Sequence, residues 1–351
     1  MEVTASKLIF ITGASRSGTT LLSFILRRQS DIFGLKELQY FGEVWDPRDR
    51  ARTLTADESV AAVAKMFARQ SQGVLAAKTT QRDEDSACEF VEGLGEFASD
   101  PASLFAATVA ELCGPSGKTI PCEQTPRNIY YATALLDVYP NAHVIHMMRD
   151  PRAVMASQKQ RWMRRRLATD KSAFPRIHTL RAKVNYHPYT ISKLWNRASQ
   201  EAARLDGHPR FTLLKFEDLV LDPEAELQAL CKSIDVEFEA GMLDIAQVNS
   251  SHQSSVGGSR HGFNKDTIDA WNQKLSAAET AVTERHCEAM MRQFGYAPSQ
   301  AGAASSDGIG MNVSYLLHLA GVLLLNPRRA WIQYRGVSAG HQPGHGKGRH
   351  N

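Results

Sequence analysis

Short apolar runs alternate along this chain with longer segments of helical periodicity, and this alternation restricts the fold more than any other feature. The apolar runs are too short for helices and are typical of buried strands. The predicted strands are residues 7–12, 73–78, 142–148 and 211–215, and helical patterns lie near residues 17–28, 57–71, 101–112, 128–138, 152–167, 191–205, 223–233 and 277–294. This alternation predicts an α/β fold whose parallel sheet carries helices on both faces. Ligands of such sheets bind beyond the carboxyl ends of the strands.

The composition is that of a globular protein with an uneven charge. The 351 residues are 43% hydrophobic and 22% charged, which excludes a disordered, collagen-like or disulfide-stapled chain. Residues 149–183 hold eleven Lys and Arg against two Asp, and residues 308–351 hold five Lys and Arg with no acidic residue. The first of these segments suggests a site for a polyanion. No nucleic-acid recognition motif accompanies it, so nucleic acid is not an expected partner.

The cysteines and histidines give no sign of a metal site. The five cysteines are scattered, without a Cys-x-x-Cys pair, and no His-Glu-x-x-His spacing occurs. We therefore expect no metal. Because the N-terminus also lacks a signal-peptide pattern, we expect a cytoplasmic protein.

A glycine-rich loop connects the first predicted strand to the first predicted helix. Its sequence, Gly-Ala-Ser-Arg-Ser-Gly-Thr-Thr at residues 13–20, has small residues where the backbone can curl around an anion at a helix N-terminus. The glycine spacing fits the nucleotide-triphosphate loop G-x-x-x-x-G-K-[ST], but Thr19 stands where that loop has lysine. Arg16, inside the loop, is the nearest cation. The pattern predicts a phosphate-binding loop unlike that of kinases and ATPases.

A second candidate anion site begins where the strand predicted at residues 142–148 ends. There the segment RDPRAVMAS at residues 149–157 enters a helix, with proline suited to its first turn. Arg149 and Ser157 can face one phosphate, and Arg161 follows Ser157 by one helical turn. A solvated charged face of the helix is the alternative interpretation.

The two motifs in this order, SRSGTT followed by RDPRAVMAS, resemble the paired phosphate loops of sulfotransferases that use 3′-phosphoadenosine 5′-phosphosulfate (PAPS). The chain looks most similar to the tyrosylprotein-sulfotransferase-like and bacterial branch. The resemblance implies a P-loop-containing sulfotransferase fold, with PAPS as the sulfuryl donor and no metal. It implies that the 5′-phosphosulfate is held by Arg16, Ser17, Gly18, Thr19 and Thr20, and the 3′-phosphate by Arg149, Ser157 and Arg161. Phe216 falls where the family often has a tyrosine near the nucleotide.

The resemblance also implies the catalytic groups. In the similar branch the general base is a glutamate about twenty residues after the loop arginine, which assigns Glu37 as the base. Arg16 is the second catalytic candidate, because the loop stabilises the departing phosphate. An ion pair with Lys36 or a helix cap is the alternative role for Glu37. Glu43 is the next carboxylate candidate, and His187 is a weaker one.

The sequence departs from the family at one position. The family commonly has a lysine before the proline of a segment that aligns with residues 123–126, and this chain has Gln124 there. Glutamine can donate a hydrogen bond to a developing oxyanion but brings no charge. Arg127 and Lys78 are candidates to compensate, and a slower enzyme is the other interpretation.

We therefore expect a sulfotransferase that moves a sulfuryl group in line from PAPS to an acceptor hydroxyl. The sequence does not choose among a carbohydrate, lipid, peptide or small-molecule acceptor. A homodimer is also possible. Two alternatives remain. The first is a P-loop small-molecule kinase, which the glycine spacing of residues 13–18 suggests and Thr19 argues against. The second is an inactive PAPS- or nucleotide-binding protein, which Gln124 suggests.

The C-terminal part is expected to be separate from this domain. We assign residues 1–298 to the sulfotransferase domain, 299–310 to a flexible linker, 311–335 to an apolar and basic helix, and 336–351 to a disordered tail. Residues 313–325 are apolar nearly all round but short of the about twenty residues that a bilayer span needs. We favour packing on the core or on a partner chain over peripheral membrane contact.

Overall fold

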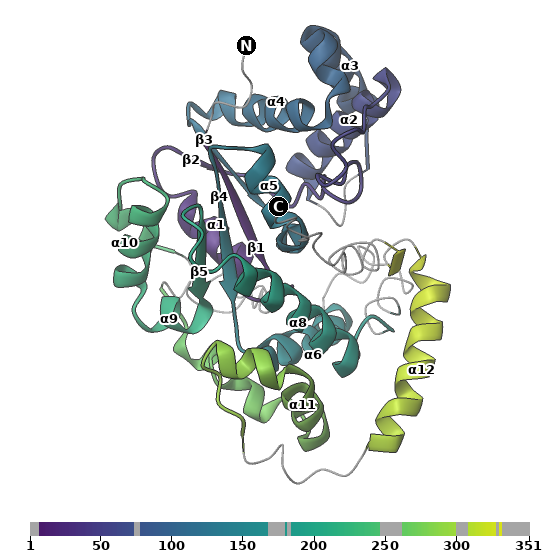
Figure 1. The fold of residues 1–351 in the computed structure, drawn as a ribbon, viewed down its shortest axis with the longest axis vertical. Helices are drawn as coiled ribbons and strands as arrows, with labels where there is room; N and C mark the ends of the chain where they lie inside the picture. Colours follow the sequence, from purple (N-terminus) through teal and green to yellow (C-terminus); the bar gives the residue numbers. More distant parts are fainter. Residues whose placement is uncertain are drawn as a thin grey trace, which may run out of the picture.

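A five-stranded parallel sheet flanked by helices forms the centre of the molecule (Figure 1). The computed structural model describes residues 7–73, 78–167, 180, 184–245, 262–299, 308–327 and 330–331, without the side chains of residues 161–167 and 308–313. The strands are β1 (Leu8–Gly13), β2 (Ile32–Gly34), β3 (Ile120–Gln124), β4 (Ala142–Met148) and β5 (Phe211–Lys215), in the order β2-β3-β1-β4-β5. The predicted α/β fold is confirmed.

The strand register brings several connecting segments to one edge of the sheet. Ile11 of β1 pairs with Gln124 of β3, and Gly13 of β1 pairs with Met147 of β4. Because every pair is parallel, the carboxyl ends of all five strands lie along the same edge. The loop after β1 therefore lies between the segments that follow β3 and β4.

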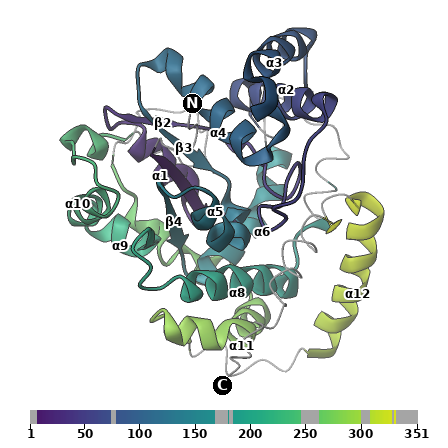
Figure 2. The ribbon, with the colours of Figure 1, turned by 45° about the horizontal axis from the view of Figure 1, so that its top comes forward.

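Helices cover both faces of the sheet (Figures 1 and 2). One face packs against α1 (Thr19–Leu26), α9 (Phe216–Leu221) and α10 (Pro223–Ser233). The other packs against α4 (Pro101–Cys113), α5 (Ala132–Val138) and α8 (Pro188–Arg204). The other α-helices of the described residues are α2 (Ala56–Gln72), α3 (Gln81–Leu94), α6 (Pro151–Leu167), α11 (Ala277–Gln293) and α12 (Gly308–Leu325).

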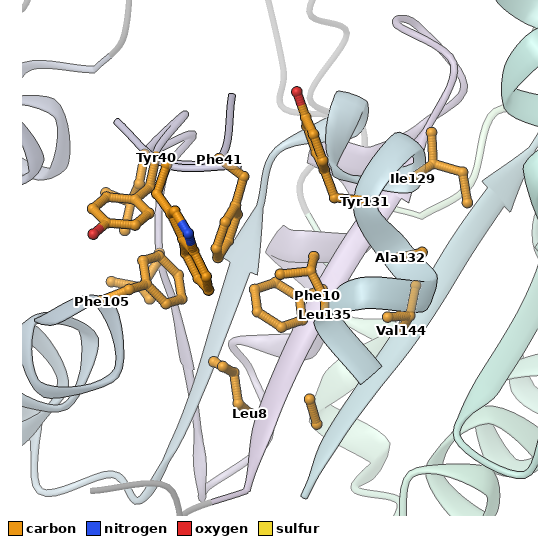
Figure 3. Close-up of a cluster of buried hydrophobic side chains, with 14 of the residues drawn as sticks. Leu8, Phe10, Tyr40, Phe41, Phe105, Ile129, Tyr131, Ala132, Leu135 and Val144 are labelled. Atoms are coloured by element: carbon orange, nitrogen blue, oxygen red, sulfur yellow. The ribbon is translucent and has the colours of Figure 1, made fainter. Parts of the chain in front are cut away.

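An aromatic cluster fixes the chain after β2 (Figure 3). The ring of Phe41 lies 5.8 Å from that of Phe10 on β1 and 4.7 Å from that of Phe105 on α4, between centroids. The hydroxyl of Tyr40 donates a hydrogen bond to the carbonyl of Pro101 (2.9 Å). Aromatic side chains bury large apolar areas, so the short segment between β2 and Tyr40 is anchored at both ends.

Most predicted elements agree with the structure. The strands predicted at 7–12, 142–148 and 211–215 are β1, β4 and β5, and the eight predicted helices are α1, α2, α4, α5, α6, α8, α10 and α11. The sequence did not predict β2, which has three residues, or β3, whose sequence IPCEQ contains a proline and a glutamate. It also missed α3, whose buried residues are Ala87 and Val91. Residues 74–77, inside the strand predicted at 73–78, lie outside the described residues.

The described C-terminal residues form helix α12. It begins at Gly308, within the stretch assigned to the linker, and packs against the chain near α8, where His187 Nε2 lies 3.0 Å from Ser314 Oγ. In the parts of the chain that the structure describes, no helix has the length and apolarity to cross a membrane. Residues 336–351 lie outside the described residues. The division into domain, linker, helix and tail stays a prediction.

Candidate active site

The loop after β1 has the backbone of an anion-binding turn. Gly18 caps helix α1 in the left-handed conformation (φ 100°), without a side-chain hydrogen bond to the helix N-terminus. The first amide groups of a helix lack carbonyl partners within it, so they can bind an anion. Arg16 also has a positive φ, of 83°. Such a conformation is unfavourable for a non-glycine residue and is often found where a loop binds a ligand.

Hydroxyl groups add to the donors of this loop. Ser17 is completely buried, and its Oγ has no hydrogen-bond partner among the described residues. A buried hydroxyl without a partner is unfavourable, and a phosphate oxygen would satisfy it. The hydroxyls of Thr19 and Thr20 accept hydrogen bonds from the side-chain amide of Gln124 on β3 (3.3 and 3.2 Å). Gln124, which stands in place of the family's lysine, therefore contacts the loop directly.

Phe216, the first residue of α9, lies between the loop and the second anion segment. A Cβ atom on residue 18 would lie 2.6 Å from Cδ2 of the Phe216 ring. On the other side, Cζ of Arg149 lies 4.0 Å from the centroid of the same ring. The close approach at Gly18 requires a residue without a side chain.

We expect Gly18→Ala to lower the free energy of unfolding by about 2–4 kcal/mol, because the strain of a positive φ adds to the clash with Phe216. Gly207→Ala is the matched control, since Gly207 has a φ of +76° and open space around its Cα. It should lose only about 1 kcal/mol, from the backbone alone. Urea denaturation measures both variants. Equal losses would show that the contact with Phe216 is unimportant.

The two predicted anion segments meet in the structure. Nε of Arg16 donates a hydrogen bond to Oγ of Ser157 on α6 (3.1 Å). The side-chain amide of Gln158 donates to the carbonyl of Ser15 (3.2 Å), and Arg149 donates to the carbonyl of Arg16 (3.2 Å). The loop after β1 and the segment after β4 therefore form one site.

The hydrogen-bond partners of Arg149 are neutral backbone carbonyls, so its positive charge is able to bind an anion. Besides the carbonyl of Arg16, its guanidinium bonds the carbonyl of Thr267 (2.9 Å), and burial lowers its pKa. The nearby carboxylates have other donors: Asp150 is bonded by Arg152 (2.6 Å), and Glu217 accepts hydrogen bonds from the N–H of Asp150 and the hydroxyl of Tyr296 (both 3.0 Å). Nε of Arg149 is buried and has no partner among the described residues.

Two of the sequence predictions fall partly outside the described residues. Arg161 belongs to helix α6, but its side chain is not described. The resemblance to the family also implies that residues 254–265 form a late loop that closes over the nucleotide, and of these residues the structure describes only 262–265. Of the residues predicted to hold the 3′-phosphate, the structure therefore describes the side chains of Arg149 and Ser157.

Glu37 lies in the segment after β2, on the same edge of the sheet as the loop after β1. Its carboxylate accepts a hydrogen bond from the side-chain amide of Gln39 (3.3 Å). The ammonium group of Lys36 donates instead to the carbonyl of Ser71 (2.7 Å), at the end of α2. The end of β3 contacts both the loop and the segment of Glu37: Gln124 bonds the threonines of the loop, and Thr125, directly after β3, accepts a hydrogen bond from the N–H of Gln39 (3.2 Å).

Glu123 on β3 also holds this segment, and the sequence reasoning did not find it. Its buried carboxylate accepts hydrogen bonds from the N–H of Leu38 (3.0 Å), the side-chain amide of Asn128 (2.8 Å) and the hydroxyl of Thr125. Burial, with a smaller contribution from the charge of Glu37, raises the pKa of Glu123 to about 7, although the hydrogen bonds from Thr125 and Leu38 act in the opposite direction. The signal available in the sequence was a single charged residue, Glu123, in the otherwise uncharged run IPCEQ.

Glu43, the second carboxylate candidate, is an ion-pair centre instead of a base. Its carboxylate bonds Lys65 (2.6 Å), Arg69 (2.9 Å) and Arg127 (3.2 Å). Although burial by itself raises the pKa of Glu43, Arg69 and Lys65 outweigh it and lower that pKa to about 2. Arg127 is held by Glu43 and by the carbonyls of Gln39 and Phe41 (both 3.3 Å), so it is not placed to replace the missing lysine.

We expect Glu43→Gln to lower the free energy of unfolding at pH 7 by about 3–5 kcal/mol, because it leaves the buried guanidinium of Arg69 without its charge partner. The ion pairs stabilise the native state fully above the ordinary glutamate pKa. This contribution is lost as the pH falls from about 4.5 to about 2, so the two proteins should converge over that range. Urea denaturation at several pH values measures this. Glu288→Gln, in an exposed pair with Arg292, is the control that should change little.

His187 and Lys78 contribute nothing visible to the site. His187 caps α8 and contacts Ser314 of α12, and burial together with His318 lowers its pKa to about 4. Lys78 is exposed, and its backbone bonds the side chain of Gln72 at the end of α2. Within the described ranges, no group of three or more His, Cys, Asp or Glu side chains is arranged to hold a metal ion.

Comparison with known proteins identifies the family of this chain. Residues 9–240 match the model of a family described as the sulfotransferase family. Human carbohydrate sulfotransferase 6 is 28% identical over 189 residues, which are 47% of this chain and 44% of that protein. Human carbohydrate sulfotransferase 5 is 26% identical over 176 residues, which are 47% of this chain and 42% of that protein. The matches thus span less than half the length of these relatives.

A solved structure supports the fold. The sulfotransferase domain from the curacin biosynthetic pathway superposes with a TM-score of 0.53 and 18% identity, over 84% of this chain and 99% of that domain. The parallel sheet, the loop after β1 and the match over residues 9–240 agree with one another. This chain belongs to the sulfotransferase family.

Proposed function

We propose that this protein transfers a sulfuryl group from PAPS to a hydroxyl group of an acceptor. The observation that supports this most is the hydrogen bond of 3.1 Å between Arg16 and Ser157, which joins two anion-binding segments 141 positions apart. PAPS carries phosphate groups at the 3′ and 5′ positions of its ribose, so it needs two such sites close together. The buried Oγ of Ser17 and Nε of Arg149, both without partners among the described residues, fit these groups.

The proposed binding roles divide between the two segments. The amides at the N-terminus of α1, with Ser17 and Arg16, hold the 5′-phosphosulfate. Arg149, Ser157 and Arg161 hold the 3′-phosphate. Gly18 allows the loop to approach Phe216, and the rings and carbonyls around Arg149 fix its guanidinium.

The proposed chemical roles involve Glu37 and the loop. PAPS supplies an activated sulfuryl group, whose bond to the phosphate oxygen breaks as the acceptor oxygen bonds to sulfur. Glu37 accepts the proton of the acceptor hydroxyl, a contribution typically of about 10²–10⁴-fold in rate. Arg16 and the amides of α1 stabilise the negative charge that develops on the departing phosphate. Gln124 adds a neutral hydrogen-bond donor beside them.

The names of the two human relatives support carbohydrate hydroxyls as the first acceptors to test. Lipid, peptide and small-molecule hydroxyls form the remaining panel. The cytoplasmic location expected from the sequence stays a prediction.

Two measurements test the proposal. Calorimetry should show binding of 3′,5′-adenosine bisphosphate, and radiolabelled sulfate should pass from PAPS to a carbohydrate or another acceptor of the panel without added magnesium. Magnesium-dependent ATP turnover without binding of the bisphosphate would replace the proposal with a kinase. Binding without transfer to any acceptor would favour a nucleotide-binding protein that does not catalyse.

A further inference from the structure

Helix α12 is docked through its polar side. His187 Nε2 lies 3.0 Å from Ser314 Oγ, and Thr190 Oγ1 lies 2.8 Å from Nε2 of the buried His318. Nζ of Lys193 donates to the hydroxyl of Tyr315 (3.2 Å). The side of α12 that faces α8 is therefore built from hydroxyl, imidazole and phenol groups.

The opposite side of α12 is apolar and exposed. Figures 1 and 2 show the helix, in yellow, at the outer edge of the molecule. Leu317 and Leu324 are 71% and 81% exposed, and the same surface carries further exposed leucines, Leu316, Leu319 and Leu323. A helix that packs on a soluble core normally has the reverse orientation, with its leucines inside. We call the five leucines the leucine face.

The C-terminal residues that include the leucine face are positively charged, which favours a negatively charged partner. Residues 308–351 contain five Lys and Arg and no acidic residue, and two of these arginines, Arg328 and Arg329, stand in the sequence three and four positions after Leu325, the last residue of α12. Trp331 is 55% exposed. Leucines on one side, flanked by cations and a tryptophan, are typical of helices that lie in the interface of an anionic membrane. A second copy of the chain would instead bring a surface of the same charge.

We propose that the leucine face of α12 binds the surface of an anionic lipid bilayer, with the helix axis parallel to the membrane plane. The polar groups that bond α8 stay on the protein side, and the leucines enter the boundary between headgroups and acyl chains. Trp331 contacts the headgroup layer. This inference is independent of the proposed sulfuryl transfer.

Vesicle sedimentation with the full chain tests this proposal. The protein should sediment with vesicles of equal parts phosphatidylcholine and phosphatidylglycerol, and less with vesicles of phosphatidylcholine alone. Added salt should weaken the binding to the anionic vesicles. Their addition should also shift the tryptophan fluorescence to shorter wavelength, and Trp331→Phe should reduce that shift.

The double variant Leu317→Ser/Leu324→Ser should lower the affinity for anionic vesicles by about tenfold or more. Leu221→Ser on α9 is the matched control, because Leu221 is another exposed leucine, and it should bind like the parent. Both variants should keep the thermal midpoint of the parent, since the changed side chains face solvent. Failure to bind anionic vesicles, or equal losses in both variants, would overturn the proposal. So would a dimer in light scattering that only the double variant dissociates, which would assign the leucine face to a second copy.

Discussion

Glu37→Gln is expected to lower kcat for sulfuryl transfer by about 10²–10⁴-fold, while the affinity for 3′,5′-adenosine bisphosphate stays that of the parent. Glutamine keeps the size of the side chain and can still bond Gln39, but it cannot take the proton of the acceptor hydroxyl. The segment itself should keep its position, because Glu123 and Thr125 hold the N–H groups of Leu38 and Gln39. Steady-state kinetics with saturating PAPS measures kcat, and calorimetry measures the affinity.

Lys36→Gln is the matched control for this variant. Lys36 is the preceding residue of the same segment, is exposed, and bonds the carbonyl of Ser71 away from the site. It should keep the kcat of the parent. If both variants lose activity equally, Glu37 acts by holding the segment and another group is the base. If neither variant changes kcat, the assignment of Glu37 as the base is wrong.

Arg149→Ala is expected to weaken binding of 3′,5′-adenosine bisphosphate by about 30-fold to several thousand-fold, as the loss of one buried charged partner of a phosphate does. Arg149 is fixed by the carbonyls of Arg16 and Thr267 and by the ring of Phe216, so its charge is already oriented before the ligand arrives. Lysine should not restore the affinity, because it cannot bond both carbonyls and stack on the ring at once. Calorimetry measures the affinities.

Selectivity for the 3′-phosphate separates this effect from misfolding. The parent should bind 3′,5′-adenosine bisphosphate much more tightly than adenosine 5′-phosphate, and Arg149→Ala should remove that preference while it still binds the 5′-phosphate. A misfolded variant would bind neither ligand. Arg292→Ala, at an exposed arginine on α11, should keep the preference of the parent. A preference that survives in Arg149→Ala would place the 3′-phosphate elsewhere.

The sequence was sufficient to predict those parts of the fold whose pattern is local. β1 and β4 are largely apolar runs of six and seven residues, completely buried, and each leads into a segment predicted to bind an anion. β3 was missed because Pro121 and Glu123 interrupt its apolar pattern, although neighbouring strands bury it completely. Its burial results from its place between β2 and β1, which no local pattern contains.

The candidate site was predictable in its residue types but not in its contacts. The sequence motifs predicted Arg16, Arg149 and Ser157 as site residues. The hydrogen bond between Arg16 and Ser157 could not be predicted in this way, because it depends on β1 and β4 being neighbours in the sheet. The same limit applies to Glu43, which looked like a candidate base. Only the fold brings Arg69 and Arg127 to its carboxylate and lowers its pKa.

For the proposed reaction, the carboxylate of Glu123, which is buried in the sheet, would contribute to the dependence of the rate on pH. Its pKa of about 7 results first from burial and then from the negative charge of Glu37. In the proposed reaction Glu37 takes up the acceptor proton, so that charge would disappear and the proton on Glu123 would be held less tightly. A rate profile against pH would then report the protonation of Glu123 as well as that of the groups that touch the substrate. A residue that never touches the substrate would thus help to set the pH at which the enzyme works.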